Sequence, residues 1–257
     1  MTQHVRVSID DHIMRITLAR PEKKNALTLE MYTALGAALD QAEADPKVRA
    51  VLLDSEGDVF SAGNDLADFA AVAAGTANRE DMTARVFLEA LARGQKPYVA
   101  AVRGLAVGIG VTLLMHCDLV YVAEDARLST PFANLGVVPE AGSSWLIPAR
   151  IGYARAYAMF ALGEAMDGRT FASLGLANAA LPAAEVQAKA LAAAKLLAGK
   201  PIGALREMKK LMRDSAAIAA IIKHESEIFG ARLKTPEAAE ALRAFAERRP
   251  PNFLQFS

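Results

Sequence analysis

Two short segments rich in small residues could present backbone amide groups to a ligand. They are FSAGNDL, residues 60–66, and GLAVGIG, residues 104–110. Small residues permit tight turns, and two such turns at neighbouring strand ends could form an oxyanion hole, in which two N–H donors stabilise a developing negative charge. The alternative is that each is an ordinary turn. The glycine order G-x-x-x-G-x-G does not match the dinucleotide fingerprint, and no Walker lysine follows it.

A single glutamate, Glu140, lies in the otherwise apolar segment NLGVVPEAGSSWLIP. Burial disfavours the charged form of a carboxyl group, so such surroundings raise its pKa toward the range useful for proton transfer. Glu140 is therefore a candidate acid or base. The alternative is an acidic residue in the first turn of a helix that starts near Ser143, where acids are common. Asp65, in the first glycine-containing segment, could cap the segment that follows it.

The remaining reactive side chains do not form a metal or nucleophile site. The four histidines, at positions 4, 12, 116 and 224, are scattered, and none has metal-ligand spacing. We expect His116, on an apolar helix, to be a structural histidine. Cys117 is the only cysteine, which excludes internal disulfides and a cysteine-based zinc site, and we expect a small buried side chain there.

Composition predicts a globular protein with a large core and no net charge. The chain has 257 residues, 53% hydrophobic, with 29 Lys+Arg against 29 Asp+Glu. One large domain is expected at this length. Zero net charge argues against nucleic-acid binding, although residues 200–257 hold 11 basic and 7 acidic residues. No signal peptide or transmembrane pattern is visible, so we expect a cytoplasmic protein without a membrane partner.

The periodicity of apolar residues predicts an α/β protein. Alternation over 5–9 and 14–18 indicates two strands joined by a turn at Asp10-Asp11. Thr28 is placed to cap a helix that Asp45-Pro46 ends. Residues 48–53, 97–104 and 118–125 read as strands, residues 111–117 as a short apolar helix, and the pattern is helical from about Pro148. Strands alternating with helices favour a mostly parallel sheet with sites at strand ends.

Four segments, in this order, resemble the crotonase (enoyl-CoA hydratase/isomerase) superfamily. They are RPEKKNALTLEMYTAL, FSAGNDLADF, residues 104–152 from GLAVGIG to ARIG, and TPEAAEALRAFAERRPPNF. The resemblance implies a ClpP/crotonase-like spiral of ββα turns over residues 1–195. It further implies a helical trimerisation region over residues 196–257, in a homotrimer or a dimer of trimers. The ligands of the family are coenzyme A thioesters, whose carbonyl lies in the oxyanion hole.

The resemblance also assigns site residues. The two oxyanion donors fall on the N–H groups of Ala62 and Ile109, with Glu140 as the third catalytic residue. The predicted substrate-binding residues comprise the neighbours of those donors, two loop lysines for the CoA phosphates, and apolar residues for the acyl pocket: Gly63, Asn64, Asp65, Leu66, Gly108, Lys23, Lys24, Phe132, Leu135 and Trp145. The basic C-terminal helices are secondary candidates for phosphate binding. No metal or redox cofactor is implied, since coenzyme A is part of the substrate.

Departures from the family pattern indicate the reaction. Hydratases of the family carry glutamates at the positions of Thr112 and Phe132, and hydration needs a carboxylate pair. The single acid Glu140 instead matches Δ3,Δ2-enoyl-CoA isomerases. The resemblance thus predicts an isomerase that moves a 3-enoyl-CoA double bond to the 2-trans position through a dienolate. The alternatives are an enoyl-CoA hydratase, a lyase or hydrolase of the family, and a non-catalytic CoA-thioester-binding protein.

Overall fold

The alternating N-terminal residues form a β-hairpin. In the computed structural model, which describes residues 2–73 and 84–256, β1 (Val5–Asp10) pairs antiparallel with β2 (Ile13–Leu18). Asp11 and His12 form the turn, both with positive φ. The two strands are confirmed, and the turn lies one residue later than predicted. Of the six residues of β1 only Val5 is buried, and the other five are exposed, as an edge strand permits.

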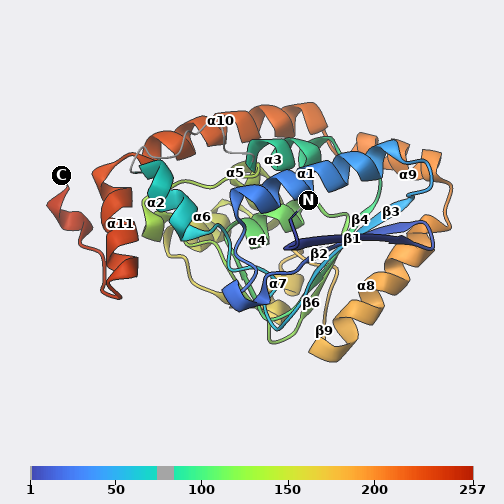
Figure 1. Cartoon of the computed structure of the whole chain (residues 1–257), viewed down its shortest axis with the longest axis horizontal. Coiled ribbons are helices and arrows are strands. Elements are labelled where there is room, and N and C mark those ends of the chain that lie inside the picture. The colour runs from blue at the N-terminus through green and yellow to red at the C-terminus, as the bar shows by residue number, and fades with distance from the viewer. Residues whose placement is uncertain (1, 74–83, 257) are drawn as a thin grey trace.

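The hairpin begins a six-stranded sheet in the order β1-β2-β3-β4-β6-β9 (Figure 1). Every pair after the hairpin is parallel. The added strands are β3 (Ala50–Ser55), β4 (Tyr98–Val102), β6 (Leu119–Ala123) and β9 (Ala179–Leu181). β3 and β4 are buried along their whole length, as expected for parallel strands covered on both faces. The parallel sheet is confirmed.

A second sheet of three strands holds the glycine-containing segment 104–110. Its order is β5-β7-β8, with β5 (Leu105–Val107) parallel to β7 (Arg127–Ser129) and β7 antiparallel to β8 (Met166–Asp167). The sequence predicted a glycine-rich turn over the whole segment. The structure shows a strand between Gly104 and Gly108, both of which have positive φ, because these glycines make the sharp bends that glycine permits.

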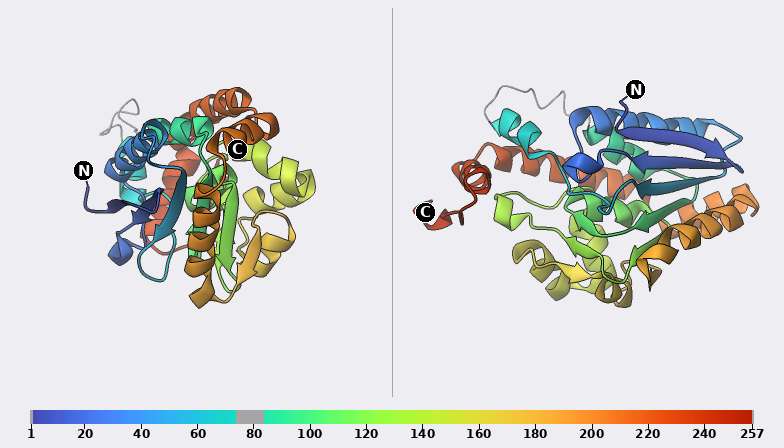
Figure 2. Two further views of the ribbon diagram at one scale, coloured as in Figure 1. Left: turned by 90° about the vertical axis from the view of Figure 1, so that its right-hand side faces the viewer. Right: turned by 60° about the horizontal axis from the view of Figure 1, so that its bottom comes forward.

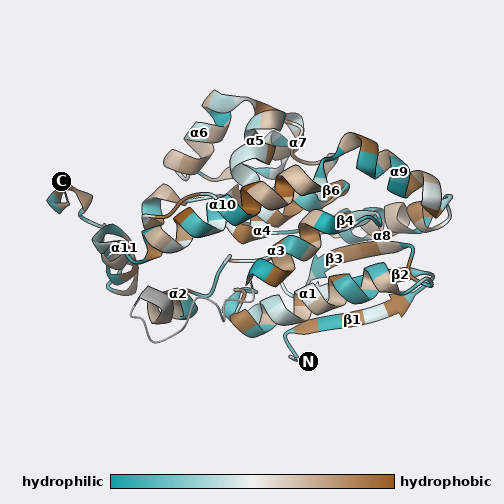
Figure 3. Cartoon of the chain, turned by 90° about the horizontal axis from the view of Figure 1, so that it is seen from above, coloured by the Kyte–Doolittle hydropathy of each residue, from teal (hydrophilic) through white to brown (hydrophobic). Residues whose placement is uncertain are grey.

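Helices cover both faces of the main sheet (Figures 1 and 2). α1 (Leu29–Ala44), α3 (Ala84–Arg93) and α10 (Ser215–Leu233) pack on one another on one side, and α8 (Ala183–Ala198) packs on β3, β4 and β6 from the other. Thr28 caps α1 through the Met31 N–H, as predicted. The remaining helices are α2 (Leu66–Ala73), α4 (Ile109–Thr112), α5 (Ser143–Ile151), α6 (Tyr153–Ala161), α7 (Gly168–Ser173), α9 (Ile202–Met212) and α11 (Pro236–Ala246). In Figure 3, the central α4 is brown, whereas α1 and α9 alternate between teal and brown.

The C-terminal helix folds back over the chain's own α2. α11 contacts α2 and the 3-10 turn Ala133–Leu135, and it lies beside α2 in the right panel of Figure 2. These elements enclose an apolar cluster separate from the main core, made by Phe69, Phe132, Val137, Phe229 and Leu233. The predicted domain boundary at residues 195/196 falls inside α8, which packs as one helix on the main sheet. The division into two domains stays a prediction.

Candidate functional site

The two segments with small residues lie side by side. The Ser61 N–H donates to the Leu105 carbonyl at 3.1 Å, and the Val107 N–H donates to the Ser61 carbonyl at 2.9 Å. Gly63 has φ +91°, and a Cβ there would come within 2.9 Å of the Val107 carbonyl oxygen. Glycine is therefore required at this position both for the backbone conformation and for the close approach. The predicted pairing of these segments is present.

The backbone hydrogen bonds show which N–H groups of the first segment have acceptors. The Ala62 N–H donates to the Lys24 carbonyl at 2.9 Å. The Gly63 N–H donates to Ser61 Oγ, and the Asp65 N–H to the Leu27 carbonyl. Within the described residues, the Asn64 N–H has no acceptor. The assignment of an oxyanion donor to Ala62 is therefore wrong in this structure, because its N–H is already bonded, and Asn64 carries the available donor.

The second segment leaves one comparable donor. Ile109 is the first residue of α4, and the first N–H groups of a helix have no partner within the helix. The Gly108 N–H donates to the Ser129 carbonyl, whereas the Ile109 N–H has no acceptor among residues 2–73 and 84–256. A Cβ at Gly108 would meet nothing within 4 Å, so the space beside this turn is open. Asn64 and Ile109 are therefore the candidate pair of donors.

Glu140 is buried, as its apolar flanks predict. Glu140 is 7% exposed, and Thr112 Oγ1 donates a hydrogen bond to its Oε1 at 2.5 Å. Burial raises the pKa of Glu140 to about 8. The Thr112 hydrogen bond opposes this rise by favouring the ionised form, and the nearby Glu225 charge adds to it. Thr112 stands where hydratases were expected to carry an acid, and it comes from the same helix as Ile109.

Residues 139–142, here called the acid loop, are held by two further buried side chains. His116 Nε2 lies 2.7 Å from the Ala141 carbonyl oxygen. Glu225, on α10, accepts hydrogen bonds from the N–H groups of Gly142 and Ser144. His116 is fully buried, as expected of a structural histidine, and Cys117 is buried, with a pKa that burial raises to about 12. The predicted helix start near Ser143 is confirmed, with Glu140 outside its first turn.

Asp65 and the loop lysines lie at the edge of the first segment. Asp65 accepts from Arg20 Nη1 at 2.7 Å and from the Ala67 N–H at 3.0 Å, so it caps the start of α2 as predicted. Lys23 and Lys24 are exposed. Burial opposes the ionisation of Asp65, but the hydrogen bonds and the charges of Arg20 and Lys23 outweigh it and lower its pKa. The positive charge of Lys23 therefore helps to stabilise the ionised Asp65 carboxylate.

Tyr32 links α1 to the first segment. Its hydroxyl donates to Asn64 Oδ1 at 2.5 Å. Its pKa is raised well above the usual value, first by burial and then by the charges of Glu140 and Asp68. Tyr32 is thus hydrogen-bonded to the side chain of Asn64 and interacts with the charge of Glu140. Tyr32 and Asn64 border a cavity of about 10 Å³, room for about one water molecule.

The predicted acyl-pocket residues are only partly brought together. Phe132 lies in the apolar cluster beneath α11, and Leu66 and Leu135 pack against that cluster. Trp145 is 45% exposed and lines a different cleft, beside α9. The prediction that Trp145 shapes the acyl pocket is therefore not supported, because the residue lies on the outer face of α5.

Sequence reasoning missed several residues of this site. Thr112 was treated only as a missing acid and His116 only as a structural residue, and Tyr32 was not considered for the site. Glu225 gave no signal at all, since it is 85 positions from Glu140 along the chain. Within the described part of the chain, no cluster of His, Cys, Asp or Glu could hold a metal ion, and no helix is long and apolar enough to cross a membrane.

This mixed α/β fold combines two available backbone donors with a buried acid, a set of groups that can stabilise an oxyanion and transfer a proton. The family model described as enoyl-CoA hydratase/isomerase matches residues 8–255. The chain belongs to this family and has the crotonase fold.

Two curated relatives and one solved structure are similar over most of the chain. "Enoyl-CoA delta isomerase 2" of Rattus norvegicus is 34% identical over 96% of this chain, which spans 64% of the rat protein, just under two thirds of its length. "Probable enoyl-CoA hydratase" of Bacillus subtilis is 32% identical over 97% of this chain and 98% of its own. The crystal structure of an enoyl-CoA hydratase/isomerase from Pseudoalteromonas atlantica superposes with a TM-score of 0.91 at 36% identity, covering 98% and 100% of the two chains.

Proposed function

We propose that this enzyme isomerises a 3-enoyl-CoA to the conjugated 2-trans-enoyl-CoA, with Glu140 as its one acid–base group. The observation that carries the proposal is the state of Glu140: it is buried, contacts Thr112, and is not paired with a basic residue in the described structure. The similarity to a delta isomerase supports the same reaction, and the similarity to a probable hydratase leaves the competing one to be tested.

The proposed reaction begins with the thioester oxygen on the N–H groups of Asn64 and Ile109. Removal of a C2 proton by ionised Glu140 produces a dienolate, whose negative charge on the thioester oxygen two fixed donors stabilise better than water does. Protonated Glu140 then returns the proton to C4. A carboxyl group that must both accept and donate a proton works best with a pKa near the operating pH, and burial brings Glu140 to about 8.

The other acids around the site support isomerisation over hydration. Hydration needs a second carboxylate to activate water. Both Glu225 oxygens accept backbone N–H groups of the acid loop and α5. Asp65 is paired with Arg20, and Asp68 accepts the Leu29 N–H. Each of these carboxylates already has a structural hydrogen-bonding role, which leaves Glu140 for chemistry.

We also propose contacts for the acyl chain and for the CoA phosphates. We place the acyl chain against the apolar cluster that includes Phe132, with Leu66 and Leu135 at its border. Exposed Lys23 and Lys24 are proposed to meet the CoA phosphates. The proposed chemistry uses no metal or redox cofactor. A homotrimer or dimer of trimers stays a prediction.

The proposal is tested by supplying the purified enzyme with 3-enoyl-CoA and, separately, 2-trans-enoyl-CoA. We expect conjugation of the first substrate, followed as the absorbance of the α,β-unsaturated thioester, at a rate at least tenfold above hydration of the second. Hydration at a matching rate would favour a hydratase. Binding of both thioesters without turnover would favour a non-catalytic binding protein.

A further inference from the structure

The acid loop has an unusual backbone that requires support. Ala141 has φ +60° and Gly142 has φ +72°, so two consecutive residues adopt the left-handed region. An alanine rarely adopts this conformation, because its Cβ approaches the following carbonyl. Such a residue persists where surrounding contacts fix it, and these positions cluster at functional sites. Here the residue directly follows the candidate acid Glu140.

We propose that His116, oriented by Arg213, is a positioning residue that fixes the Ala141 carbonyl and thereby keeps the Glu140 carboxyl against Thr112. This inference rests on the proposed function of Glu140. It gives His116 and Arg213 a role in the reaction that the resemblance did not assign to them.

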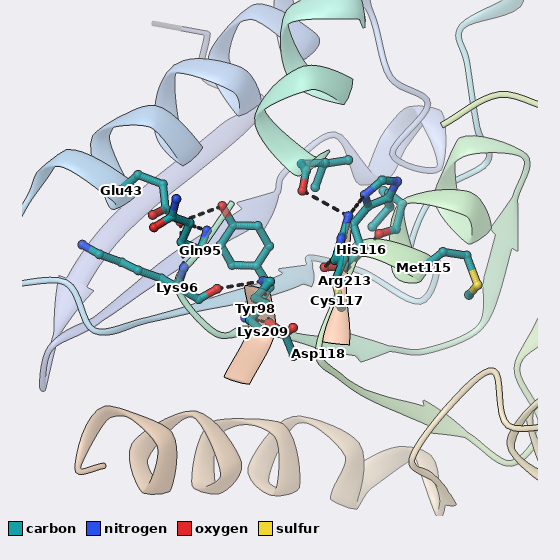
Figure 4. Close-up of polar contacts among 12 residues, drawn as sticks. Glu43, Gln95, Lys96, Tyr98, Met115, His116, Cys117, Asp118, Lys209 and Arg213 are labelled. Atoms are coloured by element: carbon teal, nitrogen blue, oxygen red, sulfur yellow. Dashed lines mark hydrogen bonds and ion pairs between the residues drawn. The ribbon is translucent and has the colours of Figure 1, made fainter. Parts of the chain in front are cut away.

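The contacts of His116 select one tautomer of its ring. Arg213 Nη2 lies 2.5 Å from His116 Nδ1, and a guanidinium group can only donate, so Nδ1 must be the acceptor. The proton then lies on Nε2, which donates to the Ala141 carbonyl 2.7 Å away. A carbonyl can only accept, so both neighbours require the same tautomer. Figure 4 shows Arg213 against the His116 ring.

Burial and charge keep this histidine neutral. Its side chain is completely buried. Burial, and then the positive charge of Arg213, lower its pKa to about 3. The Ala141 hydrogen bond opposes this change, and the charges of Arg150 and Lys209 lower the pKa by smaller amounts. His116 therefore keeps one protonation state and one hydrogen-bond direction across the working pH range. This behaviour suits a fixed support better than a proton carrier.

Arg213 is itself anchored. Its Nη1 donates to the His116 carbonyl at 3.1 Å, so the guanidinium contacts both the ring and the backbone of the same residue. Nearby, Lys209 pairs with Asp118 at 2.8 Å and lies over the Tyr98 ring (Figure 4). Asp118 therefore has its own basic partner, and Arg213 is directed at His116.

The acid loop is thus supported on two sides. His116 holds the Ala141 carbonyl, and Glu225, from α10, holds the Gly142 N–H at 2.6 Å. The groups that face Glu140 itself are Thr112 by its hydrogen bond, and Glu225 and Tyr32 by their charge interactions. Loss of the His116 contact would release the strained Ala141 while leaving Glu140, Thr112 and Glu225 chemically intact.

The test compares His116→Gln, His116→Met and Arg213→Met in the full chain, with Arg169→Met as the control. A glutamine amide can still donate to the Ala141 carbonyl, whereas methionine fills the space without a donor. Arg169 lies on α7 and forms an ion pair with Glu124 at the surface. The readouts are the histidine tautomer from ¹⁵N NMR, the pKa of ¹³C-labelled Glu140, kcat and KM, and thermal unfolding.

We expect His116 in the wild type to carry its proton on Nε2 from pH 5 to 8, and Arg213→Met to abolish this single tautomer. His116→Met is expected to lower kcat at least tenfold with KM within twofold, and to move the pKa of Glu140 back toward its usual value. His116→Gln should retain at least half of kcat, and Arg169→Met should match the wild type.

Two results would overturn the positioning role. One is a wild-type His116 protonated on Nδ1. The other is a folded His116→Met variant whose Glu140 pKa and kcat match those of the wild type. An enzyme without isomerase activity would refute the proposed function. The NMR measurements need no turnover, so the tautomer of His116 and the pKa of Glu140 would still decide the positioning role.

Discussion

The two halves of the candidate site are built by different means. The donor half, formed by residues 61–65 and 105–109, uses backbone N–H groups fixed by neighbouring backbone bonds, such as Ser61 to Leu105. The acid half uses one side chain, Glu140, fixed by other side chains: Thr112, His116 and Glu225. A backbone donor survives most substitutions, whereas a side-chain network loses a member with each change. The donor half should therefore tolerate mutation much better than the acid half.

The largest loss is expected from Glu140→Gln, in the acid half. Glutamine is nearly isosteric and keeps an acceptor for the Thr112 hydroxyl, but it cannot take a proton from C2. We expect kcat for isomerisation to fall about 10³-fold with little change in KM. Steady-state kinetics with 3-enoyl-CoA measures this. Turnover within threefold of the wild type would remove Glu140 from the mechanism.

The same substitution should stabilise the fold in a pH-dependent way. The folded pKa of Glu140 is raised from 4.5 to about 8, so the unfolded chain loses this proton more readily. The carboxyl group therefore does not oppose folding below about pH 4.5, and its cost grows as pH rises to about 8, where it reaches a few kcal/mol. Urea unfolding at pH 5 and pH 8.5 should show Glu140→Gln gaining stability over the wild type only at the higher pH.

Ile109→Pro is expected to be the most damaging change in the donor half. Proline lacks the N–H, and the first position of a helix otherwise accepts it. Loss of one oxyanion donor should lower kcat about 10²-fold. Ile109→Val keeps the N–H while trimming the same buried side chain, so it should stay within threefold. An equal loss of kcat in both variants would mean that the packing of the Ile109 side chain, rather than its N–H, causes the effect.

Thr112→Val tests the hydrogen bond between the two halves. Valine preserves the shape but removes the donor that favours ionised Glu140, so the pKa of Glu140 should rise above about 8. Because the base must be ionised to act, kcat/KM should rise with pH through about 8 in the wild type and through a higher pH in the variant. We expect about tenfold lower activity at pH 7. Thr112→Ser should behave like the wild type. If kcat/KM of Thr112→Val and of the wild type depended on pH in the same way, this role of Thr112 would be contradicted.

The smallest effect is expected from Asn64→Ala. The variant loses the Tyr32 contact but keeps the backbone N–H that we assign to the oxyanion hole. We expect kcat/KM within about threefold of the wild type, measured alongside Ile109→Pro. A loss as large as that of Ile109→Pro would mean that the Asn64 side chain, rather than its backbone, acts in the reaction.

Much of this site could be anticipated from local patterns. The apolar flanks of Glu140 correctly predicted its burial, and the small residues around Gly63 and Gly108 predicted the adjacent turns. Which N–H is available could not be read from the sequence. The N–H of Ala62 is occupied because it donates to the Lys24 carbonyl, a contact between residues 38 positions apart. The role of Thr112 likewise depends on a contact across 28 positions, and that of Glu225 on one across 83.

The proton path tests the central claim most directly. With 3-enoyl-CoA deuterated at C2, a single buried carboxyl group that takes a label from C2 and returns it to C4 should deliver part of that label to C4 in ordinary water. Mass spectrometry and NMR of the 2-trans product at low conversion measure the transfer. Deuterium at C4 in the wild type is the predicted result. A product whose new C4 hydrogen comes entirely from solvent would contradict the account of Glu140 as the one acid–base group.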